Sequence, residues 1–472
     1  MFVLYSFLLA LVMGIISYPY LKFYQLNGYN IKVFLEDIFN CPFKLDDKNK
    51  LVFTKRMTRF VVLYLVVLFC LFLPVFLFIS NFGLIFLDIV VIGIILPLLI
   101  SFAHLLICPV EIMIKKNYIK KTKRILSEFK GIKIAVVGSY GKTSVKNILS
   151  QILSTKFNVL ATPKNYNTPM GIARTVLERK TDPDVMIFEM GARKEGDIKQ
   201  LMEIVNPDWG IMTAVGAQHL DTFKDLDTIK RTKFELVKHM KRNGKILFNN
   251  LSESTRQLYK KCDKVKFFIG NKQGVAWAEN LSYSTNGLEF DLCVDEERAR
   301  VSTCLLGKFN CQNIVLASAM AYMLGVEFAD IVKSISNLTP TKNRLELLDM
   351  GNFLIIDDSY NANIEGAKEA LDVLLLFEGI KIVVTSGLVE LGSLQYEKNF
   401  VLGKQIGKVA DTVLIMNETN KKAILAGLKQ AGLKNENIYF ACSREEQKRI
   451  LSSIVKPKSV VLFQNDLPDN YK

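Results

Sequence analysis

The hydrophobic pattern separates an apolar start from a longer part in which apolar runs and amphipathic segments alternate. Three stretches before residue 110 carry almost no charge and are long enough to cross a bilayer, at residues 1–20, 60–79 and 84–107. The first stretch lacks the basic start and the small-residue cleavage site of a signal peptide. This pattern predicts three transmembrane helices in a membrane region over residues 1–125.

Beyond this region, short β-branched runs alternate with segments of helical period, which is typical of α/β folds with parallel sheets. Buried parallel strands are predicted at residues 134–137, 184–189, 209–213 and 245–248, and a small β-rich insert at residues 265–305. A helix is predicted near residues 313–324. We therefore expect a central domain over residues 126–338, with a parallel sheet of the kind found in P-loop ATPases.

A second alternating series follows the proline-containing segment at residues 338–341. Its predicted strands lie at residues 353–356, 381–385, 412–416, 438–440 and 459–463. We expect a C-terminal, Rossmann-like α/β domain over residues 339–472.

The chain is basic, with 61 Lys and Arg against 46 Asp and Glu and a net charge of +15. Basic clusters at residues 48–59 and 115–124 flank the second and third apolar stretches, so the positive-inside rule places both clusters and the catalytic domains in the cytoplasm. The sequence therefore predicts a multi-pass protein of the bacterial cell membrane, in contact with inner membrane lipids. Nucleic acid is the rival partner for this charge. It is not expected, because no basic motif is interleaved with aromatic residues.

A candidate phosphate-binding loop follows the first strand of the central domain, where residues 134–144 read IAVVGSYGKTS. Glycines let backbone N–H groups approach phosphate oxygens, a lysine supplies a positive charge, and a threonine hydroxyl can ligate Mg²⁺. Gly138 stands three residues before Gly141, whereas the standard loop places its first glycine five residues before the second. An ordinary strand-to-helix turn is the alternative explanation.

Further polar residues occur where strands of the central domain end, which is where open α/β sheets bind ligands. Glu189 directly follows a strand and could bind a cation. His219 follows the next strand and is one of 3 histidines, while Lys233 lies near the start of a helix. A structural histidine, a solvated charged helix face and, for the loop at residues 165–171, a plain connection are the alternatives.

These motifs, in this order, resemble the Mur ligases, the ATP-dependent amino-acid and peptide ligases of peptidoglycan precursor synthesis. The resemblance runs from about residue 130 to the C-terminus and rests on the segments 138–144, 165–171, 189–192, 218–220, 306–313 and 357–363. The last segment, DDSYNAN, and VELG at residues 389–392 most resemble the branch that adds D-alanyl-D-alanine to UDP-N-acetylmuramoyl-tripeptide.

The resemblance implies a reaction through an acyl phosphate, with ATP and two Mg²⁺ ions. It implies catalytic roles for Lys142, His219 and Lys233, and Lys233 aligns with a lysine that family members carboxylate with CO₂. The implied metal ligands are Thr143, Glu189, His219 and Lys233. The implied nucleotide-binding residues are Gly138, Ser139, Gly141, Lys142, Thr143, Ser144, Asn310, Asn313, Arg344 and Asp358. The implied substrate-binding residues are Asn165, Asn167, Thr168, Ser359, Tyr360, Asn361 and Asn363, each with a turn or cap role as its alternative.

The chain departs from the family at two places. Phe309 stands where the family usually has histidine, and apolar stretches stand where relatives carry a domain that binds the uridine nucleotide. Two other functions therefore remain open: a ligase for another polymer or a lipid-linked precursor, such as a poly-γ-glutamate synthetase, and a non-catalytic membrane scaffold that binds ATP.

Overall fold

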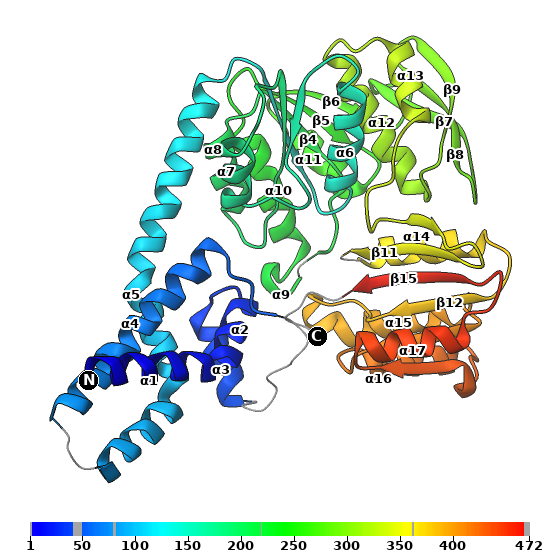
Figure 1. The fold of residues 1–472 in the computed structure, drawn as a ribbon. Coiled ribbons are helices and arrows are strands. Elements are labelled where there is room, and N and C mark those ends of the chain that lie inside the picture. Colours follow the sequence, from blue (N-terminus) through cyan, green and yellow to red (C-terminus); the bar gives the residue numbers. More distant parts are fainter. Residues whose placement is uncertain (1, 41–49, 79–81, 219, 361–362, 467–472) are drawn as a thin grey trace. The chain divides into compact units, whose positions relative to one another are not determined.

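The computed structural model describes residues 2–40, 50–78, 82–218, 220–360 and 363–466 (Figure 1). The chain divides into two compact units, Met1–Tyr118 and Ile119–Lys472. The boundary lies inside one long helix, α5 (Phe82–Glu128). The candidate functional residues all belong to the second unit.

The first unit is helical and is built around a core of aromatic and aliphatic side chains. Besides the first part of α5 it contains α1 (Phe2–Ile16), α2 (Tyr18–Leu26), α3 (Ile31–Asn40) and α4 (Lys55–Phe78). Tyr24, Phe34 and Phe60 are buried together in its core. Near one end of this core, Arg59 pairs with Glu111 at 2.6 Å.

Two helices of this unit are long and apolar enough to cross a membrane, judged by length and composition alone, over Lys55–Pro74 and Ile89–Glu128. The expected first span is not one helix. It is divided into α1 and α2, which pass the same test only as a pair and are bent by 51°. Pro19 lies in the first turn of α2. Because proline has no N–H to donate and its ring clashes with the preceding turn, it breaks the helix here.

The expected third span also ends later than the hydrophobic pattern indicated. Helix α5 continues past residue 107 through the basic cluster at residues 115–124 and stops at Glu128. Its last turns belong to the second unit, where Leu126 is buried in the core.

The second unit contains a nine-stranded sheet in the order β2-β3-β1-β4-β5-β6-β7-β8-β9. The strands are β1 (Ile132–Val137), β2 (Val159–Ala161), β3 (Val185–Glu189), β4 (Trp209–Met212), β5 (Lys245–Asn249), β6 (Val265–Ile269), β7 (Ala276–Ser284), β8 (Gly287–Val294) and β9 (Glu297–Thr303). The first six are parallel, and β7 to β9 pair antiparallel. The β-rich residues 265–305 therefore extend the main sheet.

Helices cover both faces of this sheet (Figure 1). Those of the second unit's first half are α6 (Lys142–Leu153), α7 (Pro169–Leu177), α8 (Asp197–Val205), α9 (Leu220–Phe223), α10 (Leu226–Lys238), α11 (Glu253–Lys261), α12 (Lys308–Met323) and α13 (Phe328–Ser336). Side chains of α6, α12 and α13 share one core with the sheet, and those of α7, α8 and α10 share another. Helix α6 is thereby fixed directly after β1, with its N-terminus at the carboxyl edge of the sheet.

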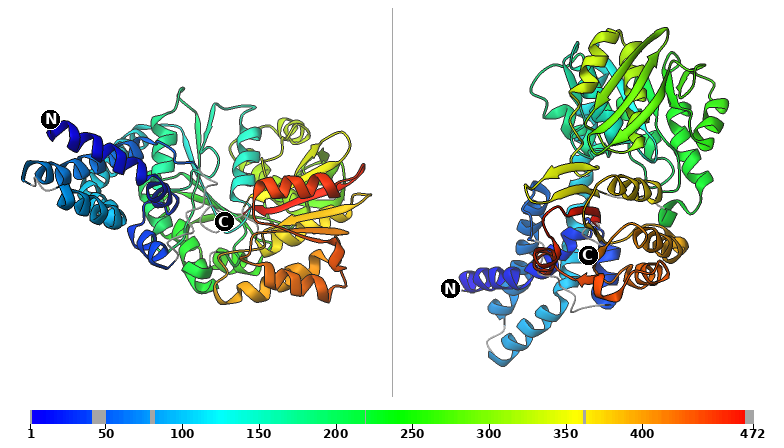
Figure 2. Two further views of the ribbon diagram at one scale, coloured as in Figure 1. Left: turned by 60° about the horizontal axis from the view of Figure 1, so that its bottom comes forward. Right: turned by 90° about the vertical axis from the view of Figure 1, so that its right-hand side faces the viewer.

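The C-terminal sheet has six strands in the order β10-β11-β15-β12-β13-β14. They are β10 (Glu346–Asp349), β11 (Leu354–Tyr360), β12 (Lys381–Thr385), β13 (Thr412–Met416), β14 (Ile438–Ala441) and β15 (Val460–Asp466). The helices are α14 (Ile364–Leu375), α15 (Gln395–Ile406), α16 (Lys421–Gln430) and α17 (Arg444–Ile454), with 3₁₀ turns η1 (Gly392–Leu394) and η2 (Asn435–Asn437). Helix α17 packs on one face and α14, α15 and α16 on the other (Figure 2).

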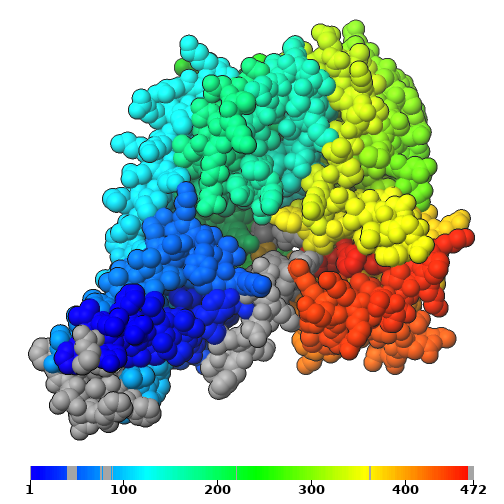
Figure 3. Space-filling model, in the orientation of Figure 1, coloured from blue at the N-terminus to red at the C-terminus, as the bar shows by residue number. Residues whose placement is uncertain are grey.

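The expected α/β fold with two parallel sheets is confirmed. The predicted strands at residues 381–385 and 412–416 coincide with β12 and β13. The hydrophobic pattern missed β10, a short edge strand that pairs antiparallel with β11. In Figure 3, the yellow surface of β11 and α14 adjoins the orange and red surface of the later elements.

Candidate functional site

The loop between β1 and α6 has the backbone that a phosphate cradle needs. Gly138 and Gly141 adopt φ values of +157° and +79°. A Cβ atom on Gly138 would lie 1.9 Å from Thr213 Oγ1, so this position excludes any side chain. Lys142 Nζ donates to the carbonyls of Gly138 and Ser139, at 2.8 Å each. The loop therefore curls around the lysine and leaves the N-terminus of α6 facing the carboxyl edge of the sheet.

The Glu189 carboxylate, at the end of β3, is the centre of a buried polar cluster. Its Oε2 accepts hydrogen bonds from Thr143 Oγ1 at 3.0 Å and from Lys146 Nζ at 3.2 Å. Its Oε1 accepts from Asn167 Nδ2 at 3.1 Å. The structure thus brings together Thr143, Asn167 and Glu189, which the sequence singles out, and adds Lys146, which it does not.

The spacing of Lys146 from Lys142 in the sequence was compatible with a place in the site, but also with an exposed position. The residue lies one helical turn after Lys142, and a lysine at that spacing is usually a solvated surface residue. Here its side chain is 1% exposed. Only the fold shows that this face of α6 points to the end of β3.

The Thr143 and Glu189 oxygens fit a magnesium ion. Mg²⁺ prefers oxygen ligands and keeps several waters, so it needs only one or two protein groups together with phosphate oxygens. Among the described residues, no three His, Cys, Asp or Glu side chains gather in a way that could hold a metal ion. His219, the expected further ligand, lies outside the described residues.

Lys233 on α10 is a buried residue and not part of a solvated charged face. Its exposure is 2%, and the Nζ lies over the Phe223 ring at 5.9 Å from the centroid. Burial, together with the positive charge of Lys142, lowers the pKa of Lys233 to about 7. The pKa of Lys142 is itself lowered to about 8, chiefly by burial. A substantial fraction of Lys233 is therefore a neutral amine near pH 7.

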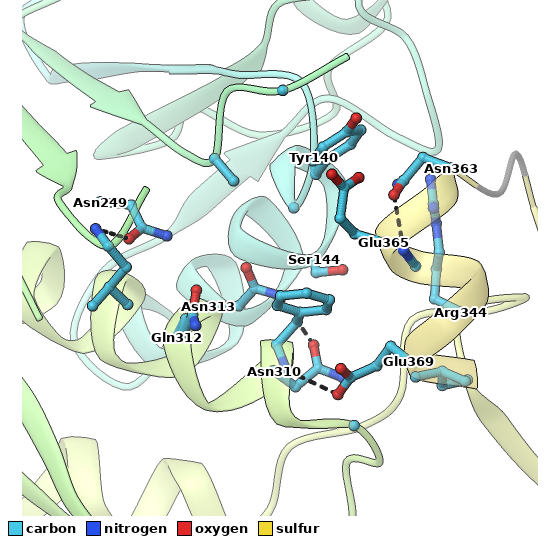
Figure 4. Close-up of a pocket in the computed structure, with 18 of the residues that line it drawn as sticks. Tyr140, Ser144, Asn249, Asn310, Gln312, Asn313, Arg344, Asn363, Glu365 and Glu369 are labelled. Atoms are coloured by element: carbon cyan, nitrogen blue, oxygen red, sulfur yellow. Dashed lines mark hydrogen bonds between the residues drawn. The ribbon is translucent and has the colours of Figure 1, made fainter. Parts of the chain in front are cut away.

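A cavity of about 320 Å³ begins beside the phosphate loop (Figure 4). It is lined by Tyr140, Gly141 and Ser144 of the loop and α6, by Phe309, Asn310 and Asn313 of α12, and by Arg344 and Asp358 of the C-terminal segment. Asn313 Nδ2 donates to Asn310 Oδ1 at 3.1 Å, and Asn310 Nδ2 donates to the Leu306 carbonyl at 2.8 Å. Phe309 is 43% exposed, so its ring is free to contact a ligand.

Other lining residues were not singled out from the sequence: Asn249, Gln312, Glu365 and Glu369. Glu369 Oε1 accepts from the Phe309 N–H at 3.2 Å, at the start of α12. Figure 4 shows Glu365 directed toward Tyr140. Isolated glutamates on a helix give no signal in sequence, and only the approach of α14 to α12 brings them here.

Two groups of opposite charge, the half-buried Arg344 and the buried Asp358, line the C-terminal side of the cavity. Burial raises the pKa of Asp358 to about 7, while the Arg344 charge opposes this shift. The Arg344 guanidinium also lies over the Tyr360 ring, 4.6 Å from its centroid. Tyr360 in turn forms a side-chain hydrogen bond with Asn165. Arg344, Tyr360 and Asn165, three candidate ligand-binding residues, are thereby linked by contacts between side chains.

Three of the candidate substrate-binding side chains bond to nearby parts of the chain. Thr168 Oγ1 accepts from Gly171 N at 3.2 Å and caps α7, and Asn363 Oδ1 accepts from Gly366 N at 2.8 Å and caps α14. Ser359 Oγ accepts from Asn343 Nδ2 at 3.2 Å. Asn361 lies outside the described residues.

Comparison with known proteins identifies the fold around this site. Residues 136–321 match the model of the Mur ligase middle domain. This part of the chain is therefore a Mur ligase middle domain. The chain is an ATP-dependent ligase, and the phosphate loop, Glu189 and most of α12 lie within the matched residues.

The most informative relatives are enzymes of one branch. A UDP-N-acetylmuramoyl-tripeptide–D-alanyl-D-alanine ligase of Bacillus subtilis is 27% identical over 336 residues, covering 66% of this chain and 73% of the relative. The ligase of the same name from Escherichia coli is 30% identical over 264 residues, covering 55% and 58%. The structure of MurF ligase from Thermotoga maritima in complex with ADP superposes with a TM-score of 0.66, at 26% identity, over 75% of this chain and 80% of that one.

The predicted multi-pass membrane localisation is wrong. The ligases that this chain resembles are soluble cytoplasmic enzymes. Only two helices in the described part of the chain pass the span test singly, in place of the three expected. Apolar stretches also occur in helices that pack against one another, as Phe60, Phe72 and Leu96 do in the first unit.

Proposed function

We propose that this chain joins D-alanyl-D-alanine to UDP-N-acetylmuramoyl-tripeptide, as the names of its relatives describe. The observation that supports this most is the shared cavity, in which the phosphate loop, α12 and Arg344 all face one ligand-sized space. A ligase for another polymer and a non-catalytic scaffold are not favoured by these relatives. Neither membrane lipids nor nucleic acid has a part in the proposed reaction.

The reaction proceeds through an acyl phosphate. The tripeptide carboxylate attacks the γ-phosphorus of ATP, and ADP leaves. The amine of D-alanyl-D-alanine then attacks the acyl carbon, the amide C–N bond forms, the C–O bond to phosphate breaks, and the amine loses a proton. Both steps bring anions together, so positive charge at the site lowers the barrier.

The chain supplies this charge from named residues. Lys142 and the N–H groups at the start of α6 hold the phosphates, and Arg344 approaches them from the C-terminal segment. Asn310 and Asn313 bind the adenine, with the exposed Phe309 ring beside them. Thr143 and Glu189 would hold one Mg²⁺ ion, and His219 and Lys233 would hold a second. Such ions would supply positive charge for the transferred phosphoryl group.

Lys233 is proposed to act as a carbamate. Its neutral amine, favoured by the lowered pKa, adds to CO₂, and the nitrogen loses a proton. A buried cation thereby becomes an anion beside Lys142. This change of sign suits a metal site and removes an unfavourable pair of like charges.

Mass spectrometry of the product tests the function directly. We expect ATP, Mg²⁺, the tripeptide nucleotide and D-alanyl-D-alanine to give a product with the mass of the two substrates minus one water, with one ADP formed for each product. Hydroxylamine in place of the dipeptide should trap the acyl phosphate as a hydroxamate. If neither product nor dipeptide-dependent ADP release is found, the proposed function is wrong.

A further inference from the structure

A buried ion pair lies behind the phosphate loop. Lys146 Nζ is 3.2 Å from Glu189 Oε2, and the two side chains are 1% and 2% exposed. Removing two charges from water is costly, and apolar residues of similar size often stabilise a fold equally well. A fully buried pair at this position therefore points to a role other than stability.

Lys146 has a second partner in a different element. Its Nζ donates to the Lys164 carbonyl at 2.6 Å. Lys164 has a φ of +48°, a left-handed conformation that is uncommon for a residue with a side chain. The ammonium of Lys146 thus helps to hold a strained turn, with the carbonyl directed toward the buried pair.

The turn belongs to a segment that we call the Asn loop, residues 162–168. Thr162 Oγ1 accepts from the Glu189 N–H at 3.0 Å, and Asn167 Nδ2 donates to Glu189 Oε1 at 3.1 Å. Both ends of the Asn loop are therefore attached to Glu189, and Lys146 attaches its middle. The loop, the carboxylate and α6 form one connected unit.

We propose that Lys146 is a positioning residue of the ligase. It orients the Glu189 carboxylate for Mg²⁺ and couples that carboxylate to the Asn loop. Binding of Mg²⁺ at Glu189 and ordering of the Asn loop are therefore coupled. The role of the Asn loop toward an acceptor rests on the proposed function, whereas the link between Lys146, Glu189 and Mg²⁺ does not depend on which acceptor is used.

A purely structural lysine would behave differently, and the chain offers a matched control. Lys133 in β1 is also buried, with 6% exposure, and its Nζ donates to the Leu126 carbonyl at 2.9 Å. Its ammonium bonds to the end of α5 and not to Glu189. Lys133→Met therefore removes a buried ammonium from the sheet that carries Glu189, without removing a hydrogen bond to the Glu189 carboxylate.

The first test measures Mg²⁺ dependence of ADP binding by calorimetry. Loss of a group that orients a metal ligand typically weakens metal binding 10- to 100-fold, so Lys146→Met should raise the half-saturating Mg²⁺ concentration by about that factor. Lys133→Met should leave it within about twofold of the wild type. Equal Mg²⁺ dependence in the two variants would overturn the proposal.

The second test uses the wild-type protein and so does not depend on whether a variant folds. Hydrogen exchange of backbone amides reports local opening. Mg²⁺ with ADP should slow exchange both in the phosphate loop and in the Asn loop. Slower exchange in the phosphate loop alone would contradict the coupling. Both tests use only Mg²⁺ and ADP and need no acceptor substrate. A failure to form the pentapeptide product would therefore overturn the proposed function, while the role of Lys146 would still be decided by these two tests.

Discussion

Two polar segments follow parallel strands in the second unit, and their side chains are used differently. At the end of β3, Glu189 receives hydrogen bonds from Thr143, Lys146 and Asn167. In the second segment, Asn363 follows β11 and caps α14, while Asn343 donates to Asp357 and Ser359 near the end of β11. In the first segment, side chains from several elements bond to one carboxylate. In the second, several side chains cap a helix or bond to neighbouring parts of the same segment.

The two arrangements indicate different roles, one in the reaction and one in the stability of the fold. A carboxylate oriented by three neighbours from different elements is ready to bind a cation without reorganising. A capping asparagine or a serine bonded to a neighbouring turn contributes mainly to stability. We therefore expect substitutions at the first segment to affect turnover, and several substitutions at the second to affect the free energy of unfolding.

The largest effect should follow from replacing Lys142. Lys142→Met removes the positive charge nearest the phosphates, so kcat should fall by about 10³-fold, as for the loss of a preorganised charge-stabilising group. The fold should remain, because the methionine fills the same space. Steady-state ADP release checks this, and a loss below tenfold would separate the loop from the chemistry.

The next largest effect is expected at Lys233. Lys233→Ala should lower kcat by about 10²-fold, since the proposed carbamate would be lost together with its metal contact. Acetate or formate in the assay should restore part of the activity by supplying a carboxylate in the space vacated by the side chain. Glycerol at the same concentration is the control, and equal rates with and without carboxylate would rule out the carbamate.

A pH effect on stability is expected at Asp358. Burial raises the pKa of this carboxyl to about 7, so the folded protein favours its neutral form. The stability that this preference contributes is fully present below pH 4 and is lost as pH rises through about 7. The groups facing it are Arg344, which opposes the shift, and Asp357, which adds to it. The Asp358→Asn variant should show a smaller fall in Tm between pH 5 and 8 than the wild type, and parallel curves would refute the assignment.

The smallest effect is expected at Asn363. Asn363→Ala removes the cap of α14 and should cost about 1 kcal/mol of unfolding free energy. Asn363→Asp, which keeps a capping oxygen, should cost less. Chemical denaturation measures both, and kcat should change by less than about threefold. A hundredfold loss of kcat would instead place Asn363 with the reacting groups.

Much of this architecture could be predicted because local signals agreed with the fold. The β-branched runs before Gly138 and at residues 381–385 and 412–416 form buried strands, since their periodicity and length leave few alternatives. The phosphate loop could be recognised from its glycines and Lys142, which stand in the required order between a strand and a helix.

The rest depends on tertiary contacts that periodicity does not report. Lys146 and Glu369 become part of the site only because α6 faces β3 and α14 approaches α12. Asn363, predicted to bind substrate with a cap role as its alternative, caps α14 in the structure. The apolar start of the chain could not decide the localisation, because helices that pack on one another and helices that cross a bilayer share the same hydrophobic pattern.

The central claim is that the buried Lys146–Glu189 pair exists for the reaction and not for the fold. Replacing both charges at once, in Lys146→Met with Glu189→Gln, leaves no unpaired buried charge, so the fold should be retained at nearly unchanged Tm. The most direct measurement is the dipeptide-dependent rate of ADP release by this double variant. We expect the rate to fall by at least about 10²-fold while the protein stays folded. A rate within a few-fold of the wild type would contradict it.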